Sequence, residues 1–422
     1  MRTLLQAASL IAILAGSNAA IAADTNAIDG RWDAVISRDG VDIPFRLDIK
    51  GGGQNLKGVF YDGFRPYDGT TSATFQDGKL TLNLEHYLTT IDAKLDHGHL
   101  TGTLATKGRD SGYSFEATRH VEAAAAHVKA PQIAGSWVIP LEAPSSKGEK
   151  AFRFVVQQHG PEVAAAILRI DGDTGSYSGS YLDGKWVLSH FDGGRPGVII
   201  VTPKPDGSLE IQQHVESHAA ANAKPDGGRA AILTAYRTDV ADAKGLPKPD
   251  DFLTHTTAKD PNAAFKFAFP DLDGKLVTND DPRFKGKVIV AVVSGTWCPN
   301  CHDEAQYLVE LDKKYRSKGL AIVDFDFEEP DQQGTLERAR AFEKQYGIKY
   351  TTLLAGAPSE MHDKVPQLNN LDTWPATIFI GRDGKVKAVH AGFSSPASGK
   401  FYTGLKQEFS DRIEHLLAES AS

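Results

Sequence analysis

The sequence predicts a multidomain protein in which an all-β N-terminal region, built of two repeated antiparallel modules, precedes an α/β domain. Three observations support this fold class. Short segments of alternating polar and apolar residues fill the first half of the chain, two stretches of that half resemble each other in order, and buried-type strands alternate with amphipathic helices after residue 260. A length of 422 residues suits two or three domains, each large enough to bury its own core.

Residues 1–22 have the composition of a cleaved signal peptide. Arg2 gives a basic start, an apolar stretch follows, and the sequence AIA at residues 20–22 offers an A-x-A cleavage site. The apolar stretch is shorter than the roughly 20 residues that a spanning helix needs, and no stop-transfer pattern follows. We therefore expect a soluble, exported protein without stable membrane insertion, located in the periplasm.

Two β-rich modules are expected at residues 28–120 and 133–238. In the first, segments such as PFRLDI, KLTLNLE and HLTGTLA alternate with turn sequences such as GGGQN and QDGK, which is typical of an antiparallel sandwich or barrel. The second repeats the plan: IDGRWDAVI resembles IAGSWVIPL, LKGVFYDG resembles YSGSYLDG, and SFEATR resembles ILTAYR. Trp32 and Trp137 occupy matching places and are predicted to anchor the edges of the two cores.

Residues 260–422 change to the pattern of an α/β domain after a linker rich in proline, glycine and charge. KVIVAVVSG and LAIVDFDFE are apolar runs of the buried-strand type, and TIFIGRDGKVKAVHAG predicts a hairpin. HDEAQYLVELDKKYRSKG and TLERARAFEKQYG are amphipathic helices that end at glycine. Apolar residues at near i+4 spacing between Phe401 and Leu416 predict a closing helix. Alternating strands and helices imply a central sheet.

Both cysteines of the chain, Cys298 and Cys301, lie in the segment SGTWCPNCHDEA. They are too close in sequence for a disulfide between them to constrain much of the unfolded chain, so stabilisation explains them poorly. The C-x-x-C-H spacing by itself fits a redox dithiol, a c-type haem attachment site or half of a zinc site. A reactive or metal-binding role is therefore expected, and the surrounding sequence must separate these three.

The cysteine pair follows a predicted buried strand and opens a predicted helix. Unpaired backbone N–H groups and the positive end of the helix dipole favour a thiolate at that place. Cys298 is predicted to be the exposed nucleophile, and Cys301, one turn further along, is placed to attack a mixed disulfide formed at Cys298. This arrangement suits thiol-disulfide exchange.

The last 160 residues or so resemble the TlpA/ResA-like exported thioredoxin-fold oxidoreductases. The resemblance rests on FAFPDLDGKLV, FKGKVIVAVVSGTWCPNCHDE, LAIVDFDFEE and TWPATIFIGRDGKV, which occur in that order. It implies a thioredoxin fold, a redox-active C-P-N-C motif containing Pro299 and preceded by Trp297, and a following Glu304. It also implies a cis Pro375 that faces the cysteines, with the backbone at Trp374 free to pair with an extended substrate.

The resemblance also implies an acidic residue after the third strand that lies near the dithiol and can exchange a proton with the buried thiol. Glu329 matches this position best and Glu328 second, although both could be solvated loop carboxylates. Two residues depart from the family pattern. Gln306 stands where a helix-bending proline is frequent, and bulky Trp374 stands where threonine or valine is usual, so Trp374 could restrict access to the dithiol.

The alternatives to a redox dithiol fit the sequence less well. A haem would need a second axial ligand, and Met361 is the only methionine after the signal peptide. A structural zinc site would need a second cysteine pair, which the chain does not have. The P-x-x-x-T/S-x-x-C pattern of peroxiredoxins is also absent. We therefore expect no metal and no cofactor. A net charge of −8 without a Lys/Arg-rich run disfavours nucleic acid or anionic membrane as a partner.

The sequence thus predicts an exported thiol-disulfide oxidoreductase that reduces the disulfides of client proteins and is itself reduced by an upstream donor such as a membrane thiol transporter. A protein of a different functional class is the alternative. It would be an assembly or ligand-binding protein whose β modules carry out the function, with a thioredoxin-like domain that only responds to redox state. The physiological direction of exchange, the clients, the role of the β modules and the oligomeric state do not follow from the sequence.

Overall fold

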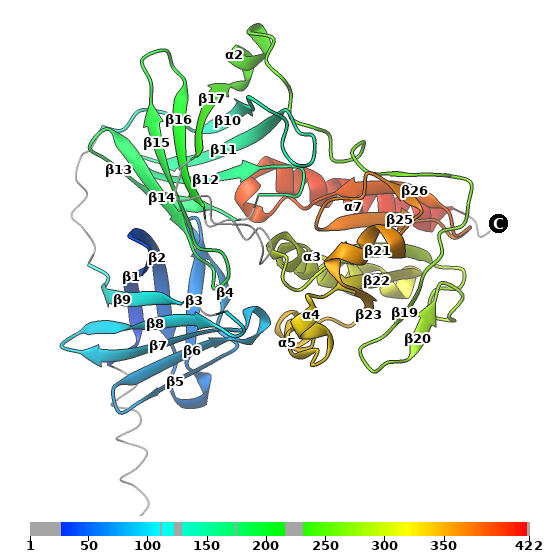
Figure 1. The fold of residues 1–422 in the computed structure, drawn as a ribbon, viewed down its shortest axis with the longest axis horizontal. Coiled ribbons are helices and arrows are strands. Elements are labelled where there is room, and N and C mark those ends of the chain that lie inside the picture. The colour runs from blue at the N-terminus through cyan, green and yellow to red at the C-terminus, as the bar shows by residue number, and fades with distance from the viewer. Residues whose placement is uncertain (1–26, 110–111, 122–128, 174, 216–230, 420–422) are drawn as a thin grey trace, which may run out of the picture.

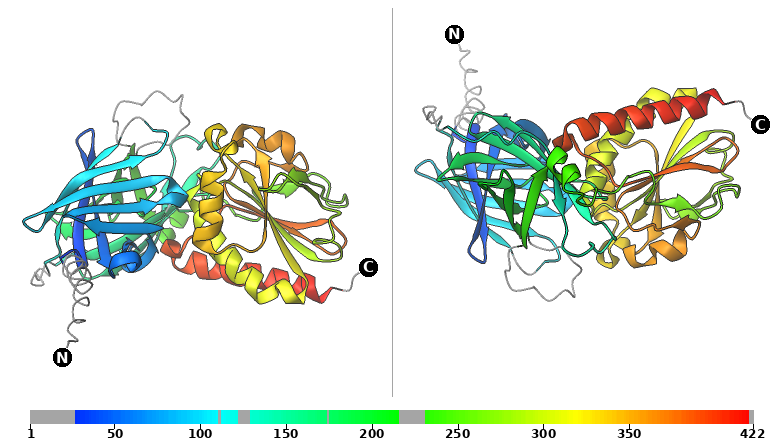
Figure 2. Two further views of the ribbon diagram at one scale, coloured as in Figure 1. Left: turned by 90° about the horizontal axis from the view of Figure 1, so that it is seen from below. Right: turned by 90° about the horizontal axis from the view of Figure 1, so that it is seen from above.

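The computed structural model describes residues 27–109, 112–121, 129–173, 175–215 and 231–419. The predicted signal peptide lies outside these residues. Two β modules lie next to each other, and an α/β domain that contains the C-terminal part of the chain packs beside them (Figure 1). The same arrangement is visible from two further directions (Figure 2). The predicted order of all-β region and α/β domain is therefore confirmed.

The first β module is a nine-stranded antiparallel sheet with the order β4-β3-β2-β1-β9-β8-β7-β6-β5. Its strands are β1 (Gly30–Arg38), β2 (Val41–Lys50), β3 (Lys57–Asp62), β4 (Arg65–Gly69), β5 (Ser72–Gln76), β6 (Lys79–Leu84), β7 (Thr89–Asp96), β8 (His99–Thr106) and β9 (Tyr113–Arg119). Apolar side chains at alternate positions fill its core, as the period of two predicts. A short 3-10 helix, η2 (Glu85–Tyr87), joins β6 to β7.

The second β module is a closed barrel in which each strand pairs with its neighbours in sequence and β10 pairs with β17. Its strands are β10 (Gly135–Pro140), β11 (Ala151–His159), β12 (Glu162–Leu168), β13 (Tyr177–Leu182), β14 (Lys185–His190), β15 (Gly197–Pro203), β16 (Leu209–Val215) and β17 (Ala231–Arg237). Large apolar side chains, including Trp186 and Phe154, fill the barrel interior. The interior of the barrel is therefore filled by side chains and forms the core of this module.

The two modules repeat one packing device at their first strands. The indole N–H of Trp32 and that of Trp137 each donate to the carbonyl oxygen four residues earlier, at 3.0 and 2.9 Å. The guanidinium of Arg119 lies 4.3 Å from the Trp32 ring centre, and that of Arg237 lies 4.1 Å from the Trp137 ring centre. Both tryptophans are buried, so they are core residues as well as anchors.

One of the three predicted sequence matches pairs strands that occupy different places in the strand order of the two modules. LKGVFYDG forms β3, the third strand of its sheet, whereas YSGSYLDG forms β13, the fourth strand of its barrel. The similarity comes from an Asp-Gly turn after an alternating strand, which many antiparallel hairpins share. The outer two matches do occupy equivalent first and last strands.

The α/β domain has a mixed five-stranded sheet with the order β23-β22-β21-β25-β26, in which β21, β22 and β23 are parallel and β25 and β26 are antiparallel to their neighbours. The strands are β21 (Val288–Ser294), β22 (Leu320–Phe327), β23 (Thr351–Gly356), β25 (Ala376–Ile380) and β26 (Val386–Ala391). The helices are α3 (Pro299–Tyr315), α4 (Pro330–Gln333), α5 (Glu337–Tyr346), α6 (Met361–Lys364) and α7 (Lys400–Ala418). The predicted hairpin and closing helix are thus confirmed.

Smaller elements complete this half of the chain. Helix α2 (Thr238–Ala243) follows the barrel, β18 (Thr257–Ala258) pairs with β24 (Leu368–Asn369), and β19 (Ala268–Pro270) pairs with β20 (Leu276–Thr278). A 3-10 turn, η5 (Pro396–Ser398), precedes α7.

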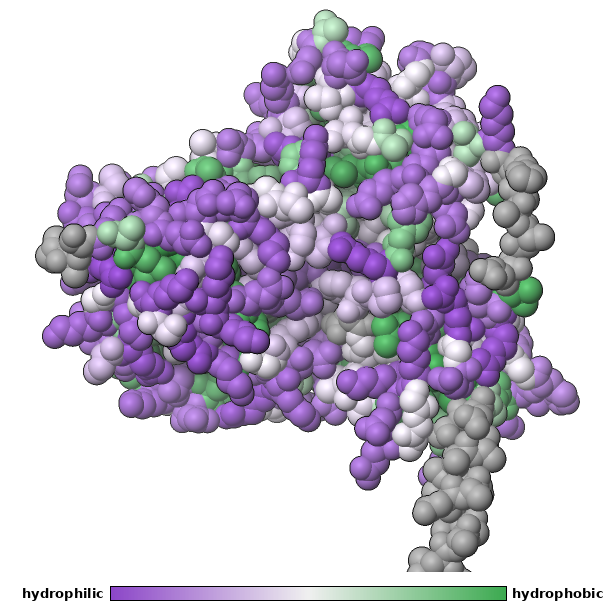
Figure 3. Space-filling view, turned by 180° about the vertical axis from the view of Figure 1, so that it is seen from behind, coloured by the Kyte–Doolittle hydropathy of each residue, from purple (hydrophilic) through white to green (hydrophobic). Residues whose placement is uncertain are grey.

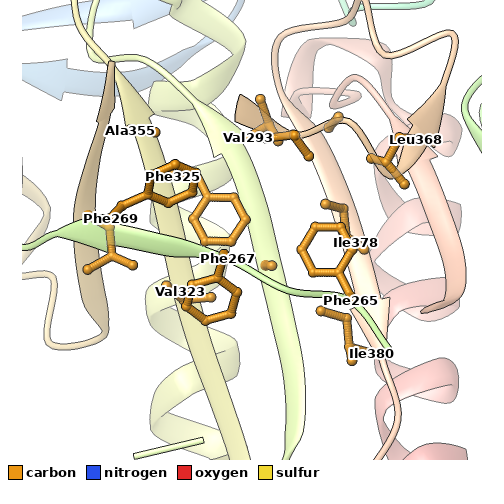
Figure 4. Close-up of a cluster of buried hydrophobic side chains, with 14 of the residues drawn as sticks. Phe265, Phe267, Phe269, Val293, Val323, Phe325, Ala355, Leu368, Ile378 and Ile380 are labelled. Atoms are coloured by element: carbon orange, nitrogen blue, oxygen red, sulfur yellow. The ribbon is translucent and has the colours of Figure 1, made fainter. Parts of the chain in front are cut away.

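Both faces of the five-stranded sheet are buried. On one face, Phe265, Phe267 and Phe269 pack against Phe325 and its neighbours (Figure 4). On the other face, the side chains of α3 and α7 cover the alternate residues of β21 and β22. A strand buried on both sides requires an apolar run, which explains the continuous apolar sequence of β21.

One face of the molecule is largely polar. On the face drawn in Figure 3, hydrophilic residues predominate and apolar residues are scattered in small groups. Within the described ranges, no helix combines the length and the apolar character needed to cross a bilayer.

Candidate thiol-disulfide site

Cys298 and Cys301 lie where strand β21 gives way to helix α3, as predicted. Cys298 is the N-cap of α3, Pro299 is its first residue, and the two cysteine Cα atoms are 5.3 Å apart in a disulfide. Proline suits this position because the first helical N–H has no partner within the helix. The backbone N–H of Cys301 donates to the Cys298 sulfur at 3.3 Å. This donor and the helix dipole would stabilise a thiolate at Cys298.

The prediction that Cys298 is exposed is wrong for this structure. The exposed fraction of Cys298 is 2%, and that of Cys301 is 3%. A turn of the barrel contacts Asn300 between the two cysteines, and side chains of the first β module pack against the next residues of α3. The sequence could not indicate these contacts, because the contacting groups come from other domains.

The peptide bond between Trp374 and Pro375 is cis, as the family resemblance implied. The Trp374 ring is half-buried and lies edge-on to Trp297, with ring centres 5.1 Å apart, and to Phe327 at 5.7 Å. The indole N–H of Trp297 donates to the carbonyl oxygen of Phe327 at 2.8 Å. Trp297 and Trp374 therefore form one aromatic group beside the dithiol loop. A role of Trp374 in restricting access stays a prediction.

Of the two candidate acids, Glu328 is the one inside the protein. Its side chain is fully buried and accepts hydrogen bonds from the backbone N–H and hydroxyl of Thr296, two residues before Cys298. The guanidinium of Arg338 on α5 forms ion pairs with both carboxylates, with N–O distances of 2.6 Å to Glu328 and 3.0 Å to Glu329. The Glu329 side chain is 43% exposed, and Glu329 is the N-cap of helix α4. Burial thus favours Glu328 over Glu329 as the acid behind the dithiol loop, and a proton-exchange role for either stays a prediction.

The position of Glu328 follows from the alternation of strand β22. Asp324 and Asp326 point to the face that α3 covers, and Glu328 continues this period of two just beyond the strand end. Asp326 is fully buried and interacts with the neighbouring carboxyl group of Glu328. Burial raises the pKa of Asp324 to about 7 and also raises the pKa of Asp326. The sequence DFDFEE contained this signal.

Glu304 is a further buried acid, one turn after Cys301 on α3. It accepts a hydrogen bond from the hydroxyl of Thr377, two residues after the cis proline. Burial raises the pKa of Glu304 to about 8, with the hydrogen bond from Thr377 acting in the opposite direction. The resemblance placed Glu304 next to the motif, and the fold connects it to the cis-proline segment.

Replacing Glu304 by glutamine should reduce the loss of stability between pH 5 and pH 8. The folded-state pKa of about 8 lies above the ordinary value of 4.5, so the carboxyl group favours folding below pH 4.5 and this contribution disappears as the pH rises to about 8. Glutamine keeps an acceptor for Thr377 and does not ionise. The melting temperature of the variant relative to wild type should therefore be higher at pH 8 than at pH 5.

The control for this experiment is Glu310→Gln, at an exposed position of the same helix. It should change the melting temperature little at either pH. Equal pH dependence of wild type and Glu304→Gln would contradict a buried, protonated Glu304.

His302 and Asp303, directly after the dithiol, contact the first β module. The His302 ring stacks on Tyr87 with ring centres 4.3 Å apart, and Tyr67 donates a hydrogen bond to Asp303. Burial holds the pKa of His302 well below its ordinary value and raises the pKa of Asp303 to about 8. His302 therefore serves as a neutral packing residue, and no group of three or more potential metal ligands occurs in the described ranges.

The α/β domain matches the family model described as Redoxin over residues 257–403. Thiol-disulfide oxidoreductase ResA of Bacillus thuringiensis (strain Al Hakam) is 32% identical over 120 residues, which are 28% of this chain and 62% of that protein. ResA of Geobacillus kaustophilus (strain HTA426) is 26% identical over 165 residues, 39% of this chain and 88% of that protein. The chain thus spans about three fifths of the length of the first of these relatives.

A solved structure of a thiol:disulfide interchange protein from Chlorobium tepidum TLS covers 38% of this chain and all of its own, with 23% identity and a TM-score of 0.31. The Redoxin match and the ResA relatives confirm that the C-terminal domain is thioredoxin-like and resembles the thiol-disulfide oxidoreductases. The Redoxin match covers residues 257–403 and does not extend into the β modules.

Proposed function

We propose that this chain is an exported thiol-disulfide oxidoreductase that reduces protein disulfides through Cys298 and Cys301. One observation carries the proposal: the two cysteines of the chain form a disulfide at the N-terminus of α3, within a domain that matches the Redoxin family model. A helix N-terminus stabilises the thiolate that thiol-disulfide exchange requires.

The proposed reaction transfers two electrons from the dithiol to a client. The Cys298 thiolate attacks one sulfur of the client disulfide, and the other client sulfur leaves as a thiolate that takes up a proton. The Cys301 thiolate then attacks the Cys298 sulfur and releases the second client thiol. The chain is left with the Cys298–Cys301 disulfide, the state seen in this structure. An upstream dithiol must reduce it before the next cycle.

Export is part of the proposal because the N-terminal 22 residues have the features of a signal peptide. The compartment would be the periplasm, and a membrane thiol transporter is the class of donor that could deliver electrons there. Clients would be exported proteins with accessible disulfides. We also propose that the units of the chain follow the predicted boundaries, with residues 260–422 as the redox domain.

The proposal is tested with the full mature chain in glutathione buffers of graded redox potential. The fraction of disulfide, measured by mass after thiol labelling, should follow a single reversible two-electron transition. The reduced chain should also reduce a model protein disulfide stoichiometrically. A pair of cysteines that never exchanges with glutathione, or a purified protein that carries haem, would refute the proposal.

A further inference from the structure

A turn of the β-barrel lies directly on the dithiol loop. It follows strand β12 and is closed by two hydrogen bonds between Arg169 and Gly172, of 3.0 and 3.1 Å. Gly172 adopts φ of +123° and forms a parallel bridge with Phe393 of the thioredoxin-like domain. A Cβ atom at Gly172 would lie 2.1 Å from the Phe393 carbonyl oxygen and 2.9 Å from the side chain of Asn300. Only glycine permits this close approach.

Asp171, inside this turn, accepts three hydrogen bonds from the thioredoxin-like domain. Its backbone carbonyl accepts from the backbone N–H of Phe393 and from the side-chain amide of Asn300, both at 2.9 Å. Its carboxylate accepts from the backbone N–H of Trp374 at 3.1 Å. We call these three donors the client edge: the amide of Asn300, the N–H of Trp374 and the N–H of Phe393.

Three further contacts hold the turn in place. Lys147 of the barrel forms an ion pair with Asp171 and donates to the carbonyl oxygen of Asp372 at 2.7 Å. The buried carboxylate of Asp173 accepts from the backbone N–H of Ser395 at 3.0 Å. The contacts with Asp372 and Ser395 join the barrel to loops of the thioredoxin-like domain.

In this arrangement Cys298 offers little surface to an incoming sulfur. The incoming sulfur must reach the Cys298 sulfur directly, yet Cys298 is 2% exposed. An extended client segment would use unpaired backbone N–H groups next to the dithiol, as peptides do at an open strand edge. Asp171 already accepts hydrogen bonds from the backbone N–H of Trp374 and from that of Phe393, so neither group is available to a client in this structure.

We propose that the barrel turn, residues 169–173, is a built-in occupant of the client edge and that a client segment binds only after this turn has moved away. The proposal rests on the proposed reductase function, because it names the regulation of the same site. Asp171 presents a carbonyl and a carboxylate to the edge, so the competing client segment must offer acceptors, through its backbone carbonyls or an acidic side chain near its cysteine.

Two substitutions in the full chain test the turn. Asp171→Ala removes the carboxylate that binds the Trp374 N–H and Lys147, and Gly172→Ala places a methyl group against Phe393 and Asn300. The matched control is Gly184→Ala in the turn between β13 and β14. Gly184 also has a positive φ, +83°, but a Cβ atom there would meet no other atom within 4 Å, so this variant strains the barrel without touching the dithiol domain.

The readout is the rate at which dithiothreitol reduces the Cys298–Cys301 disulfide. One thiolate of the reagent attacks Cys298, and Cys301 leaves as a thiolate. The second reagent thiolate then attacks the reagent sulfur of the mixed disulfide, Cys298 leaves as a thiolate, and the reagent becomes a cyclic disulfide, so two electrons pass to the protein. Loss of a hydrogen bond to a charged group should raise the open population, and hence the rate, about tenfold. Asp171→Ala and Gly172→Ala should both react faster, and Gly184→Ala should match wild type.

Wild-type rates in both turn variants would overturn the proposal, as would an equal acceleration in Gly184→Ala. If Gly172→Ala fails to fold, Asp171→Ala decides alone. The reduction of a model protein disulfide is measured in parallel. If no form of the chain reduces that client, the proposed function fails, while the dithiothreitol rates still report whether the turn covers the dithiol.

Discussion

Replacing Cys298 by serine should abolish reduction of a model protein disulfide, lowering the rate to the uncatalysed background. Cys298 caps α3, where its sulfur accepts the Cys301 N–H, and a hydroxyl at this place does not ionise near neutral pH. Without a thiolate, no mixed disulfide with the client can form. The measurement is the initial rate of client reduction by the full chain with a regenerating thiol.

The matched variant is Cys301→Ser, which keeps the attacking thiol but lacks the resolving one. It should accumulate a mixed disulfide between Cys298 and the client, visible as a covalent adduct on a non-reducing gel. In the reduced wild type, limited alkylation near neutral pH should label Cys298 first. A label mainly on Cys301, or adducts formed by Cys298→Ser, would reverse the assigned roles.

Replacing Arg338 by methionine should lower the free energy of unfolding by about 3–5 kcal/mol, because it leaves a buried carboxylate without its partner. Glu328 is fully buried, and Arg338 is its only cationic contact within the described ranges. The same arginine donates to the Thr296 hydroxyl at 2.8 Å, so the change also loosens the segment that leads to Cys298. Chemical denaturation of the full chain, followed by fluorescence, measures the effect.

Two controls separate loss of the buried pair from general loss of charge. Arg340→Met removes an exposed ion pair of the same helix, with Asp273, and should cost at most about 1 kcal/mol. Replacing both members of the buried pair, with Glu328→Leu and Arg338→Met together, should recover most of the lost stability. Equal midpoints for Arg338→Met and Arg340→Met would contradict a stabilising contact between Arg338 and Glu328.

Many elements of the thioredoxin-like domain could be predicted because the patterns that specify them lie within short stretches of the sequence. The apolar run of β21, the amphipathic pattern of α3 and the turn at Gly384 in the β25–β26 hairpin each depend on residues near one another in sequence. The position of Cys298 as N-cap follows from the same local pattern. The order of these elements sufficed for the family resemblance, and the Redoxin match agrees with it.

The repeated β modules were harder to align, because antiparallel strands with Asp-Gly turns resemble one another at many registers. Trp32 and Trp137, each with an arginine over its ring from the last strand, mark equivalent positions. The turn sequences by themselves do not, and the match of β3 with β13 failed for that reason. Closure of the second module into a barrel depends on pairing between β10 and β17, about a hundred residues apart.

By itself, the sequence determined which residues can carry out thiol exchange and on which local elements they lie. Only the tertiary structure decided which of them are accessible. Burial is a property of surfaces brought together from distant segments, so no window around Cys298 contains the barrel turn that contacts Asn300 in the dithiol loop. The same reason places Asp171, about 130 residues before the dithiol, on the N–H of Trp374. Local patterns specify the chemistry of this site, and packing between domains sets its availability.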